Sequence, residues 1–470
     1  MNQLMRIVLI ASLICFGCSS FVSAADSPYL KVIRAKGVNI EKDGTAYLYK
    51  QPFQKEVKKN GPLAGKTIAL VVASDFSDWQ AYYFVSYIGE FGGKVQFVMD
   101  NNHLWKSPTP MNGIPTEPLG MWGLSLSGGF NGQGINGGRA LPPALMKPGE
   151  GLAKDYPVAK PEDYDALIIL GDNSGDVLHP DDVALKFIKG VSDRGVPVAA
   201  VGGGILPLIK LKIVNGKNVT GGASVDYMLK RVAHYMGNSS VVTDGKLITG
   251  RNTIDSPAVL RALCKVFDPN FVDTDKGILK GKRILAMVTE DFEDIELCGP
   301  VLELMYRGAA ITVGLFPYTY KARGSHWQED VRTGQFGVTI PFQEIPMKDY
   351  QIVDSKYLKV ADYDALWTPG AFSPWQMVET GQPIQFLKDF YKAGKIVGVI
   401  CHGPVAAANA DLVRGKKVTA WLIADDPVTI MGGTYSFDWA ATWDGNLVSG
   451  RLPPNVAEFV DLLTAALLAK

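Results

Sequence analysis

Residues 281–288 read Gly-Lys-Arg-Ile-Leu-Ala-Met-Val, and residues 65–72 read Gly-Lys-Thr-Ile-Ala-Leu-Val-Val. Both stretches lead from a glycine and a lysine into a continuous apolar run, which is typical of a strand buried on both faces of a parallel sheet. The two stretches lie 216 positions apart in the chain. Their likeness suggests that one fold is present twice.

Three more pairs of segments recur in the same order along the chain. The segments at 163–167, 215–220 and 244–251 reappear at 362–366, 414–419 and 444–451. Their offset is 199 or 200 positions, which indicates a tandem duplication. In both copies apolar runs alternate with amphipathic helical stretches. We therefore predict an α/β protein with two doubly wound, flavodoxin-like parallel-sheet domains, in which ligands bind at the carboxyl ends of the strands.

The composition is that of a globular protein without a charge bias. The chain has 470 residues, of which 47% are hydrophobic, and 47 basic residues balance 47 acidic ones. These proportions exclude a disordered or collagen-like chain. The absence of net charge removes the usual electrostatic reason to expect a nucleic acid or an anionic membrane as a partner.

The first 24 residues have the layout of a secretory signal peptide. A basic residue at position 6 is followed by an apolar run over 7–16 and by small residues up to Ala24. The run is shorter than the ~20 residues that span a bilayer, so we predict cleavage after Ala24 and a soluble periplasmic or secreted protein without a membrane span. A lipoprotein anchored through Cys18 stays open as an alternative.

This assignment divides the chain into four parts. Residues 1–24 form the signal peptide, 25–64 an N-terminal arm ahead of the first copy, 65–270 the first domain, and 281–470 the second domain. A stretch rich in glycine and proline at 107–150 is predicted to be a surface loop or lid.

Export would leave three cysteines in the mature chain, Cys264, Cys298 and Cys401. An odd number requires at least one free thiol unless chains are cross-linked, so the fold depends on its core rather than on disulfides. The sequence has no metal-ligand spacing, Walker loop or dinucleotide fingerprint. We therefore expect neither a metal nor a cofactor.

Residues 395–404 read Lys-Ile-Val-Gly-Val-Ile-Cys-His-Gly-Pro and place a cysteine between an apolar strand and a helix. A sharp turn at that point would hold the side chain of Cys401 at the end of the sheet, as in a nucleophile elbow. Amide groups at the start of the helix would favour the thiolate, so we expect a lowered pKa of the Cys401 thiol. The alternative is a small buried apolar side chain at a strand end.

An acidic segment follows the first strand of the second copy. Residues 289–300 read Thr-Glu-Asp-Phe-Glu-Asp-Ile-Glu-Leu-Cys-Gly-Pro, and this strand is expected to neighbour the one that leads to Cys401. Several of these acids are explained as solvated charges at a helix start. Glu296, one turn into the helix, is the acid placed to turn inward. We expect it to be protonated, because its proton would bridge to the sulfur.

These residues resemble the PfpI-type family, within the class I glutamine-amidotransferase-like superfamily that also holds the parkinsonism-associated deglycase and the glyoxalase-active heat-shock chaperones. The family pattern has Glu-Phe-Glu-Asp-Val-Glu-Leu after the first strand, then a Pro-Gly-Gly turn, then Ile-Cys-His-Gly-Pro at the elbow; the matching segments here are 290–297, 368–370 and 400–404. The resemblance implies that Cys401 is the nucleophile, Glu296 the acid bonded to its sulfur, and His402 the adjacent base or orienting group. The substrate-binding positions expected with them are Gly370, Gly403, Trp375 and Arg451.

Two departures from the family pattern restrict the implied activity. In the protease branch the turn is followed by Arg-Ala-Pro-Glu, whose acid partners the elbow histidine, whereas this chain has Trp375 in place of the acid. A protease-type triad lacks its orienting carboxylate here, which argues against protease activity. The glutaminase branch needs a histidine downstream of the cysteine, and none follows His402. We therefore exclude glutaminase chemistry.

The first copy lacks the chemical groups of the site. Aligning the copies places Gly202 opposite Cys401, Gly203 opposite His402, and Gln80 where the second copy has its acid. Because family members usually dimerise, the resemblance implies that the first copy stands in as the second subunit of an internal pseudo-dimer, with further homo-oligomers left open. Alternatively, the glycines at 202–204 bind a small anion through their backbone N–H groups.

Two classes of function remain. The first is a cysteine-dependent hydrolase or a glyoxalase- or deglycase-like enzyme, which acts through Cys401 on a small-molecule carbonyl compound or its adducts. The second is a non-catalytic, redox-sensing or chaperone-like periplasmic protein in which Cys401 is oxidised. Retention of Glu296 and His402 favours the first class, and loss of one whole site favours the second.

Overall fold

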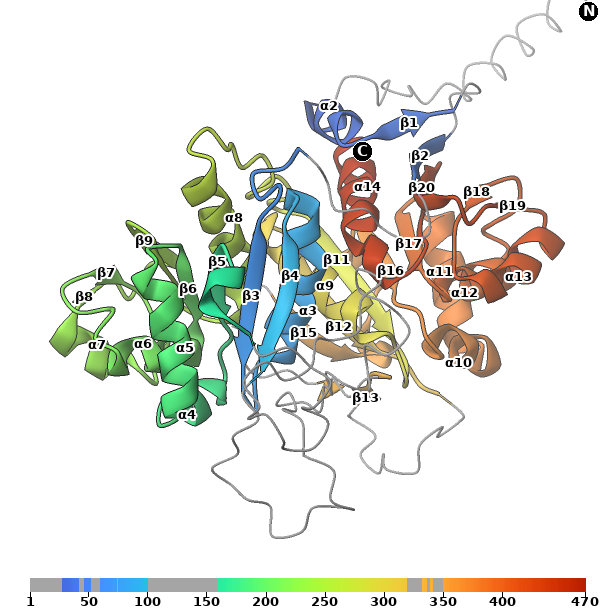
Figure 1. Cartoon of the computed structure of the whole chain (residues 1–470). Coiled ribbons are helices and arrows are strands. Elements are labelled where there is room, and N and C mark those ends of the chain that lie inside the picture. The colour runs from blue at the N-terminus through green and yellow to red at the C-terminus, as the bar shows by residue number, and fades with distance from the viewer. Residues whose placement is uncertain are drawn as a thin grey trace, which may run out of the picture.

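The computed structural model describes residues 28–41, 46–51, 60–73, 75–99, 159–318, 332–335, 339–340 and 350–470 (Figure 1). The predicted signal peptide at 1–24 and the predicted lid at 107–150 lie outside these residues. Cys264, Cys298 and Cys401 are all buried and free of disulfides. Among the described residues no helix is long and apolar enough to cross a bilayer. The same residues contain no group of three or more His, Cys, Asp or Glu side chains that could hold a metal ion.

The first domain is built on a six-stranded sheet with the order β4-β3-β5-β6-β10-β9. All neighbouring strands are parallel except β9 and β10, which form an antiparallel hairpin. The strands are β3 (Thr67–Val72), β4 (Lys94–Met99), β5 (Ala166–Ile169), β6 (Val198–Val201), β9 (Val241–Asp244) and β10 (Leu247–Gly250).

The second domain repeats this order as β12-β11-β16-β17-β21-β20 and extends it at both edges. The strands of the repeat are β11 (Arg283–Val288), β12 (Ala310–Leu315), β16 (Ala365–Thr368), β17 (Ile396–Ile400), β20 (Trp439–Asp444) and β21 (Leu447–Gly450). β15 (Tyr350–Asp354) is added beside β12, and β2 (Ala46–Lys50) followed by β1 (Val38–Ile40) is added beside β20. The prediction of two tandem doubly wound α/β domains is confirmed.

Helices cover both faces of each sheet, as a doubly wound fold requires. The outer layer of the first domain has α4 (Ser174–Leu178), α5 (Asp182–Asp193), α6 (Leu206–Lys210) and α7 (Asp226–Val232). The outer layer of the second has α10 (Ser373–Thr380), α11 (Gln382–Lys392), α12 (Gly403–Asn409) and α13 (Asp425–Ile430). Three short ladders complete the fold: β7 (Asn218–Val219) with β8 (His234–Tyr235), β18 (Lys417–Val418) with β19 (Thr434–Tyr435), and β13 (Arg332–Thr333) with β14 (Thr339–Ile340).

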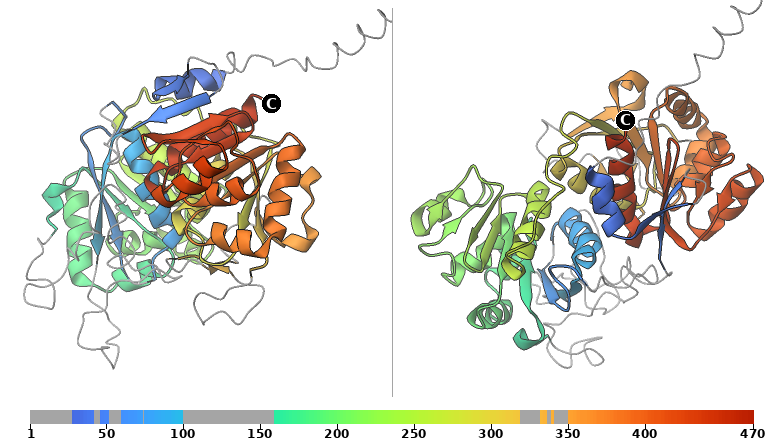
Figure 2. Two further views of the ribbon diagram at one scale, coloured as in Figure 1. Left: turned by 90° about the vertical axis from the view of Figure 1, so that its right-hand side faces the viewer. Right: turned by 90° about the horizontal axis from the view of Figure 1, so that it is seen from above.

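The inner helices of both domains meet between the two sheets (Figure 2). They are α3 (Asp78–Ile88) and α8 (Ser256–Phe267) of the first domain, and α9 (Asp294–Tyr306) and α14 (Val456–Leu468) of the second. One apolar core runs through all four helices. Burial of this continuous apolar surface is the main force that holds the two domains together.

The contacts between the domains are reciprocal, as expected for a pseudo-twofold arrangement. α3 packs on its equivalent α9, α8 touches α9, and α14 touches α3. Gly299 of α9 lies at the crossing of the helices, where an added Cβ would be 3.1 Å from Val456 Cγ1 and 3.8 Å from Ser86 Oγ. The two copies therefore face each other through equivalent helices, as an internal pseudo-dimer would.

Within the N-terminal arm, α2, β1 and β2 belong to the second domain, although they precede the first in the chain. β2 pairs antiparallel with β20, and α2 (Pro28–Ala35) packs on α14 with its apolar face buried. The sequence alone places this segment simply ahead of the first copy. The physical reason for its position is that β20 would otherwise leave an open sheet edge, which the arm covers.

Candidate active site

Cys401 stands at a strained turn between β17 and α12. Its φ is +59°, in the left-handed region that side chains other than glycine rarely adopt, and Gly202 of the first domain has φ +55° at the equivalent turn. The Cys401 N–H donates to the Gly450 carbonyl at 3.0 Å, and its carbonyl accepts the Trp421 N–H at 2.9 Å. Only 4% of the residue is exposed. The backbone on both sides therefore fixes the thiol at the carboxyl end of β17.

Gly370 is the point at which the predicted site residues converge. An added Cβ at this glycine would lie 2.6 Å from Cys401 Cβ, 2.8 Å from His402 N and 2.9 Å from Glu296 Oε2. The Gly370 N–H donates to Glu296 Oε2 at 2.7 Å. The structure thus brings together Cys401, His402, Glu296 and Gly370, which the sequence had grouped as a site.

Glu296 is fully buried in the first turn of α9, and this controls its charge. Burial raises its pKa to about 8, although the Gly370 N–H and the Cys401 thiol partly offset the shift. The neighbouring Glu293, which accepts the Glu296 N–H at 2.9 Å, also has a pKa raised by burial and by the adjacent acids. At neutral pH Glu296 is therefore mainly protonated, as expected from the sequence. The cause is burial and not a bridge to the sulfur, because the hydrogen bond with Cys401 lowers this pKa.

The pKa of the Cys401 thiol does not follow our expectation. Burial raises it well above its ordinary value, and the charges of Glu296 and Glu293 raise it further. The N–H groups of Ala371 and His402 lower it, but they are the smaller influence. The prediction of a lowered pKa was wrong, because a sequence pattern carries no measure of how completely this turn is removed from water.

His402 is neutral in the folded protein. Its Nδ1 lies 3.3 Å from Cys401 Sγ, and burial lowers its pKa to about 4. Its ring lies 6.5 Å from the ring of Trp421, which in turn meets Phe437 at 6.4 Å. A neutral imidazole whose Nδ1 carries no proton can accept a hydrogen bond from the thiol at this distance.

Ala371 and Trp421 are site residues that sequence reasoning missed. Ala371 has φ +56°, and this conformation directs its N–H toward the sulfur together with that of His402. Two amide donors beside a nucleophile can stabilise an oxyanion on the reacting carbonyl. A backbone donor leaves no signature in its side chain. The only sequence signal for Ala371 was its place directly after the Pro-Gly turn.

The predicted substrate-binding residues do not all lie beside Cys401. Trp375 is partly buried against an apolar group made of Val405, Ala420 and Ala424. Gly403 packs against β16 and β17, since an added Cβ would be 2.9 Å from Thr368 Oγ1. Both residues support the elbow helix, and Gly370 alone of the predicted substrate-binding residues touches Cys401 and Glu296.

Arg451 is buried, and its guanidinium holds the backbone of two other segments. It donates from Nη1 to the carbonyls of Gln51 and Phe437 at 2.9 and 2.8 Å, and from Nε to Asn455 Oδ1 at 3.0 Å. Burial lowers its pKa. These contacts join the arm to the segment that carries Phe437, behind Trp421 and His402, and give Arg451 a structural role.

The first domain keeps the backbone of the site without its chemistry. Gln80 Oε1 accepts the Gly171 N–H at 2.8 Å, in the same way that Glu296 accepts that of Gly370. Gln80 Nε2 donates to Thr253 Oγ1 at 3.0 Å. Gly202 supplies no side chain, so the first domain has no nucleophile at this turn.

The model of the DJ-1/PfpI family matches residues 66–266 and again residues 282–466. The second of these regions is the doubly wound domain with the cysteine elbow and the buried acid beside it. The first is the equivalent domain that lacks the cysteine and the acid. The chain belongs to the DJ-1/PfpI family and carries two domains of that family in tandem.

Several characterised relatives are similar at modest identity. Protein DJ-1 homolog D of Arabidopsis thaliana is 28% identical over 313 residues, which cover 65% of this chain and 78% of that protein. A deglycase of Pyrococcus abyssi is 30% identical over 188 residues, covering 38% of this chain and 99% of the deglycase. Protein/nucleic acid deglycase 2 of Escherichia coli is 28% identical, covering 38% of this chain and 93% of its own length.

Proposed function

We propose that this protein is a cysteine-dependent enzyme of the glyoxalase or deglycase type, which acts through Cys401 on small carbonyl compounds or their adducts. One observation carries the proposal: the sulfur lies 3.3 Å from the Nδ1 of a neutral His402, beside a buried and largely protonated Glu296. A nucleophile, a proton acceptor and a proton donor thus share one water-poor site. Relatives named as deglycases support this family-level reading.

The chemistry follows from these three groups. His402 Nδ1 takes the proton of the thiol as the sulfur attacks the carbonyl carbon and a C–S bond forms. The carbonyl oxygen becomes negative and is stabilised by the N–H groups of Ala371 and His402. Glu296 or the imidazolium then protonates this oxygen, which gives a hemithioacetal with no change in oxidation state of the sulfur.

Two outcomes follow from the hemithioacetal. With a dicarbonyl compound, the carbon that bears the sulfur loses its proton and the neighbouring carbonyl oxygen gains one, which gives an enediol. The neighbouring carbon then takes up a proton while the hydroxyl on the sulfur-bearing carbon loses its own, and the product is a thioester of a 2-hydroxy acid. Water hydrolyses this thioester, releases the acid and restores the thiol. With an adduct of an amine, expulsion of the amine before hydrolysis would release the modified group.

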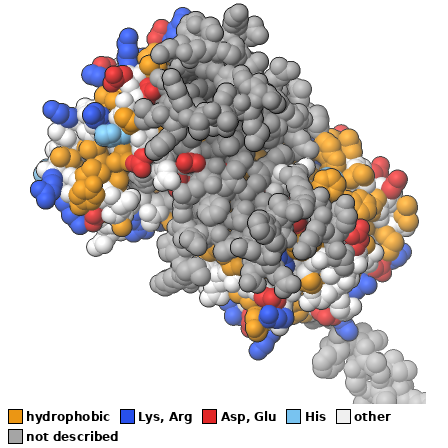
Figure 3. Space-filling model, turned by 90° about the horizontal axis from the view of Figure 1, so that it is seen from below, with side chains coloured by type: hydrophobic (Ala, Val, Ile, Leu, Met, Phe, Trp, Pro, Cys, Tyr) orange, Lys and Arg blue, Asp and Glu red, His pale blue; other side chains and the backbone are white. Residues whose placement is uncertain are grey.

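The surroundings of the site suit an uncharged substrate. The ring of Trp421 lies near the rings of His402 and Phe437, and the segments beside the site expose Phe372, Leu422 and Ile423 to solvent. Seen from below, apolar side chains reach the surface on both domains (Figure 3). Protease activity is less well supported, since no carboxylate of the described residues bonds to His402.

We also propose that the protein acts outside the cytoplasm, in the periplasm or after secretion. The support is the basic, apolar and small-residue layout of residues 1–24. Mass spectrometry of the mature N-terminus tests this proposal. A chain that begins at residue 25 is expected, and a full-length N-terminus in the exported fraction would oppose it.

Turnover of methylglyoxal and of its adduct with N-acetyl-arginine tests the activity. The full chain should form lactate from methylglyoxal or release the free amine compound from the adduct. Cys401→Ser should lose at least about 100-fold in rate because it lacks the nucleophile. Cys264→Ser, which changes a buried thiol of the first domain, is the matched control and should retain activity.

Labelling separates the two classes of function. Alkylation or peroxide oxidation of Cys401 without turnover of either substrate would support the redox-sensing or chaperone-like alternative. It would overturn the proposal that the protein is an enzyme. Equal rates in the wild type and Cys401→Ser would exclude Cys401 as the nucleophile.

A further inference from the structure

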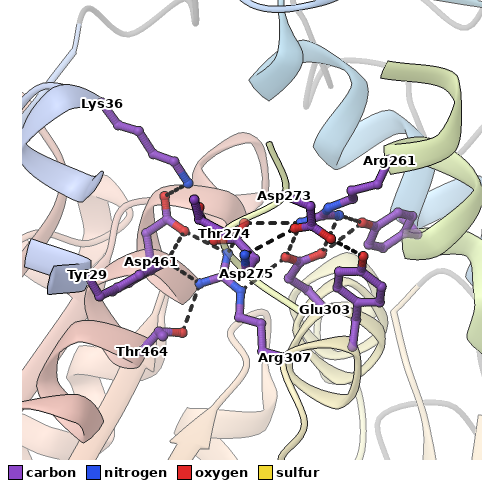
Figure 4. Close-up of polar contacts among 12 residues, drawn as sticks. Tyr29, Lys36, Arg261, Asp273, Thr274, Asp275, Glu303, Arg307, Asp461 and Thr464 are labelled. Carbon is purple, nitrogen blue, oxygen red and sulfur yellow. Dashed lines mark hydrogen bonds and ion pairs between the residues drawn. The ribbon is translucent and has the colours of Figure 1, made fainter. Parts of the chain in front are cut away.

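A buried network of charged side chains joins the two domains (Figure 4). Arg261 of α8 in the first domain donates from Nη2 to Glu303 Oε1 at 2.5 Å and from Nη1 to Oε2 at 2.9 Å, and Glu303 belongs to α9 of the second. Tyr83 of α3 also donates to Glu303 Oε2, at 2.8 Å. All three side chains are buried, so the pairing takes place away from water.

On the second-domain side, the network continues through Arg307. This guanidinium lies 3.1 Å from Glu303 Oε1 and 2.7 Å from Asp461 Oδ1, and it donates to the Tyr29 hydroxyl of the arm at 2.6 Å. Asp461 also pairs with Lys36 of the arm at 2.9 Å. Each buried charge therefore has an opposite charge within contact distance.

The two domains carry different residues at equivalent positions of this network. Gly92 and Gly308 both have positive φ after α3 and α9, and the carbonyls before them, of Phe91 and Arg307, accept equivalent N–H groups. These matches fix the offset of the two helices at 216, so Tyr87 of the first domain corresponds to Glu303.

The same comparison applies to α8 and α14. Gly250 and Gly450 end the equivalent strands β10 and β21, an offset of 200. Arg261 of the first domain therefore corresponds to Asp461 of the second, which has the opposite charge. Likewise Tyr83 corresponds to Gly299, which has no side chain to reach Glu303.

These correspondences show what pairing of like domains would produce. If two second domains met through this face, Asp461 of one would replace Arg261 opposite Glu303 of the other, and the Tyr83 hydroxyl would be lost. Glu303 would keep Arg307 of its own domain as a partner, but it would lose both bonds from Arg261 and gain a second carboxylate opposite it. If two first domains met, Arg261 would face Tyr87 in place of a carboxylate. Removing one partner from a buried, hydrogen-bonded ion pair is strongly destabilising.

We propose that this charge arrangement makes the first domain the specific partner for the α9 and α14 face of the second domain and rejects a second copy of that domain. The degenerate copy then has a defined role: it occupies a face that would otherwise be open to self-association. The inference does not depend on the activity of the Cys401 site.

The segment between the domains favours pairing within one chain. Asp275 lies 3.3 Å from Arg261 Nη2 and 3.6 Å from Arg307 Nη2, and Asp273 accepts a hydrogen bond from the Tyr306 hydroxyl. The connection between the domains is thus held in the same network. Exchange of a domain with another chain would have to break these contacts as well.

A double-mutant cycle in the full chain tests the proposal. Arg261→Asp gives the first domain the residue that the second carries at this position, and Glu303→Gln removes the facing charge. Hydrogen exchange of α3 and α9 is measured, together with the mass in solution by light scattering. We expect the mass of one chain for the wild type. Arg261→Asp should accelerate exchange of both helices at least about tenfold more in the wild-type background than in the Glu303→Gln background.

Lys265→Asp, an exposed position on the same helix, is the control for a change of net charge and should leave exchange near the wild-type rate. If Arg261→Asp fails to fold, its recovery by Glu303→Gln is the supporting result. Failure in both backgrounds, or an equal increase in exchange in both, assigns Arg261 a steric role and overturns the proposal. Self-association of the wild type in which peptides of α9 become protected would likewise overturn the rejection of a second copy.

Discussion

At the scale of single residues, the site depends on the absence of a side chain at Gly370. The glycine lets the Glu296 carboxyl, the Cys401 side chain and the His402 N–H come within contact of one point. The pKa of Glu296 near 8 then follows from the lack of water around this point. Close packing around Gly370 therefore explains both the short distances between the site residues and the protonated state of Glu296.

Gly370→Ala should separate Cys401 from Glu296, because the new Cβ would lie 2.6 Å from Cys401 Cβ. We expect a loss of roughly 1–3 kcal/mol in stability from overpacking and at least about a tenfold change in the rate of Cys401 alkylation. The control is Gly171→Ala, the equivalent change in the first domain, whose Cβ would lie 2.4 Å from the Val201 carbonyl oxygen. It should cost similar stability without altering Cys401. Equal effects of both variants on alkylation would refute the role of Gly370.

Glu296→Gln should change the pH dependence of stability. The pKa of this carboxyl is about 8 in the folded protein against an ordinary value of 4.5, so between these values the unfolded chain has released a proton that the folded protein retains. The contribution to stability is complete below pH 4.5 and is lost as the pH rises through 8. At a pH of about 8 the Glu296→Gln variant should be more stable than the wild type by at least about 1.4 kcal/mol, which corresponds to about one pKa unit.

Urea unfolding at about pH 5 and about pH 8 measures this effect, with Gln80→Glu as the reciprocal control. Gln80 occupies the same place in the first domain, so a carboxyl there should make stability fall between the two pH values. A Glu296→Gln variant with the same pH dependence as the wild type would show that Glu296 is not the titrating group.

The main residues of the site could be read from the sequence, but their environment could not. Cys401, Glu296 and His402 stood out because a thiol, an acid and an imidazole follow strands that end at the same edge of the sheet. The expectation that these two strands are neighbours was wrong, because β16 lies between β11 and β17. Ala371 did not, since a backbone donor depends on a φ of +56° rather than on residue type. The direction of the Cys401 pKa was wrong because amide donors were expected to outweigh a burial that only the packed structure reveals.

At the scale of elements, the arm and the last strands of the second domain act as one unit. β2 completes the sheet beside β20, and Arg451 holds the Gln51 carbonyl at the end of the arm. The equivalent Arg251 of the first domain is one-third exposed and pairs only loosely with Asp255, at 3.4 Å. The repeat predicted that equivalent strands, such as β3 and β11, occur in the two sheets, but not β15, which has no counterpart in the first sheet. It could not predict the docking of the arm, because no second arm exists for comparison.

Arg451→Lys should loosen the arm, since one ammonium cannot replace a guanidinium that bonds three acceptors in different directions. We expect faster hydrogen exchange at residues 46–51 and a loss of roughly 1–3 kcal/mol. Arg251→Lys in the first domain should cost much less. If instead Arg451→Lys raises KM without changing exchange or stability, Arg451 binds substrate, as the family resemblance implied.

At the scale of the whole molecule, the duplication explains why two similar domains face each other. The buried charges between them explain why the two domains are not interchangeable. The repeat predicted two domains that face each other, and the reciprocal contacts of α3, α8, α9 and α14 agree with it. The charged network at their interface was not predicted. Sequence periodicity marks the buried face of a helix, but it does not tell which charged residues on that face will meet a partner from another domain.

Cys401 is the reactive thiol of the site and the adjacent Glu296 raises its pKa, and the rate of Cys401 alkylation by iodoacetamide against pH tests this most directly. Burial and the Glu296 carboxylate raise the pKa of the thiol, so wild-type alkylation should rise only at a pH well above the ordinary thiol value. Glu296→Gln removes that charge and should move the midpoint to lower pH. An identical midpoint in both proteins, or alkylation of Cys264 or Cys298 before Cys401, would contradict the account.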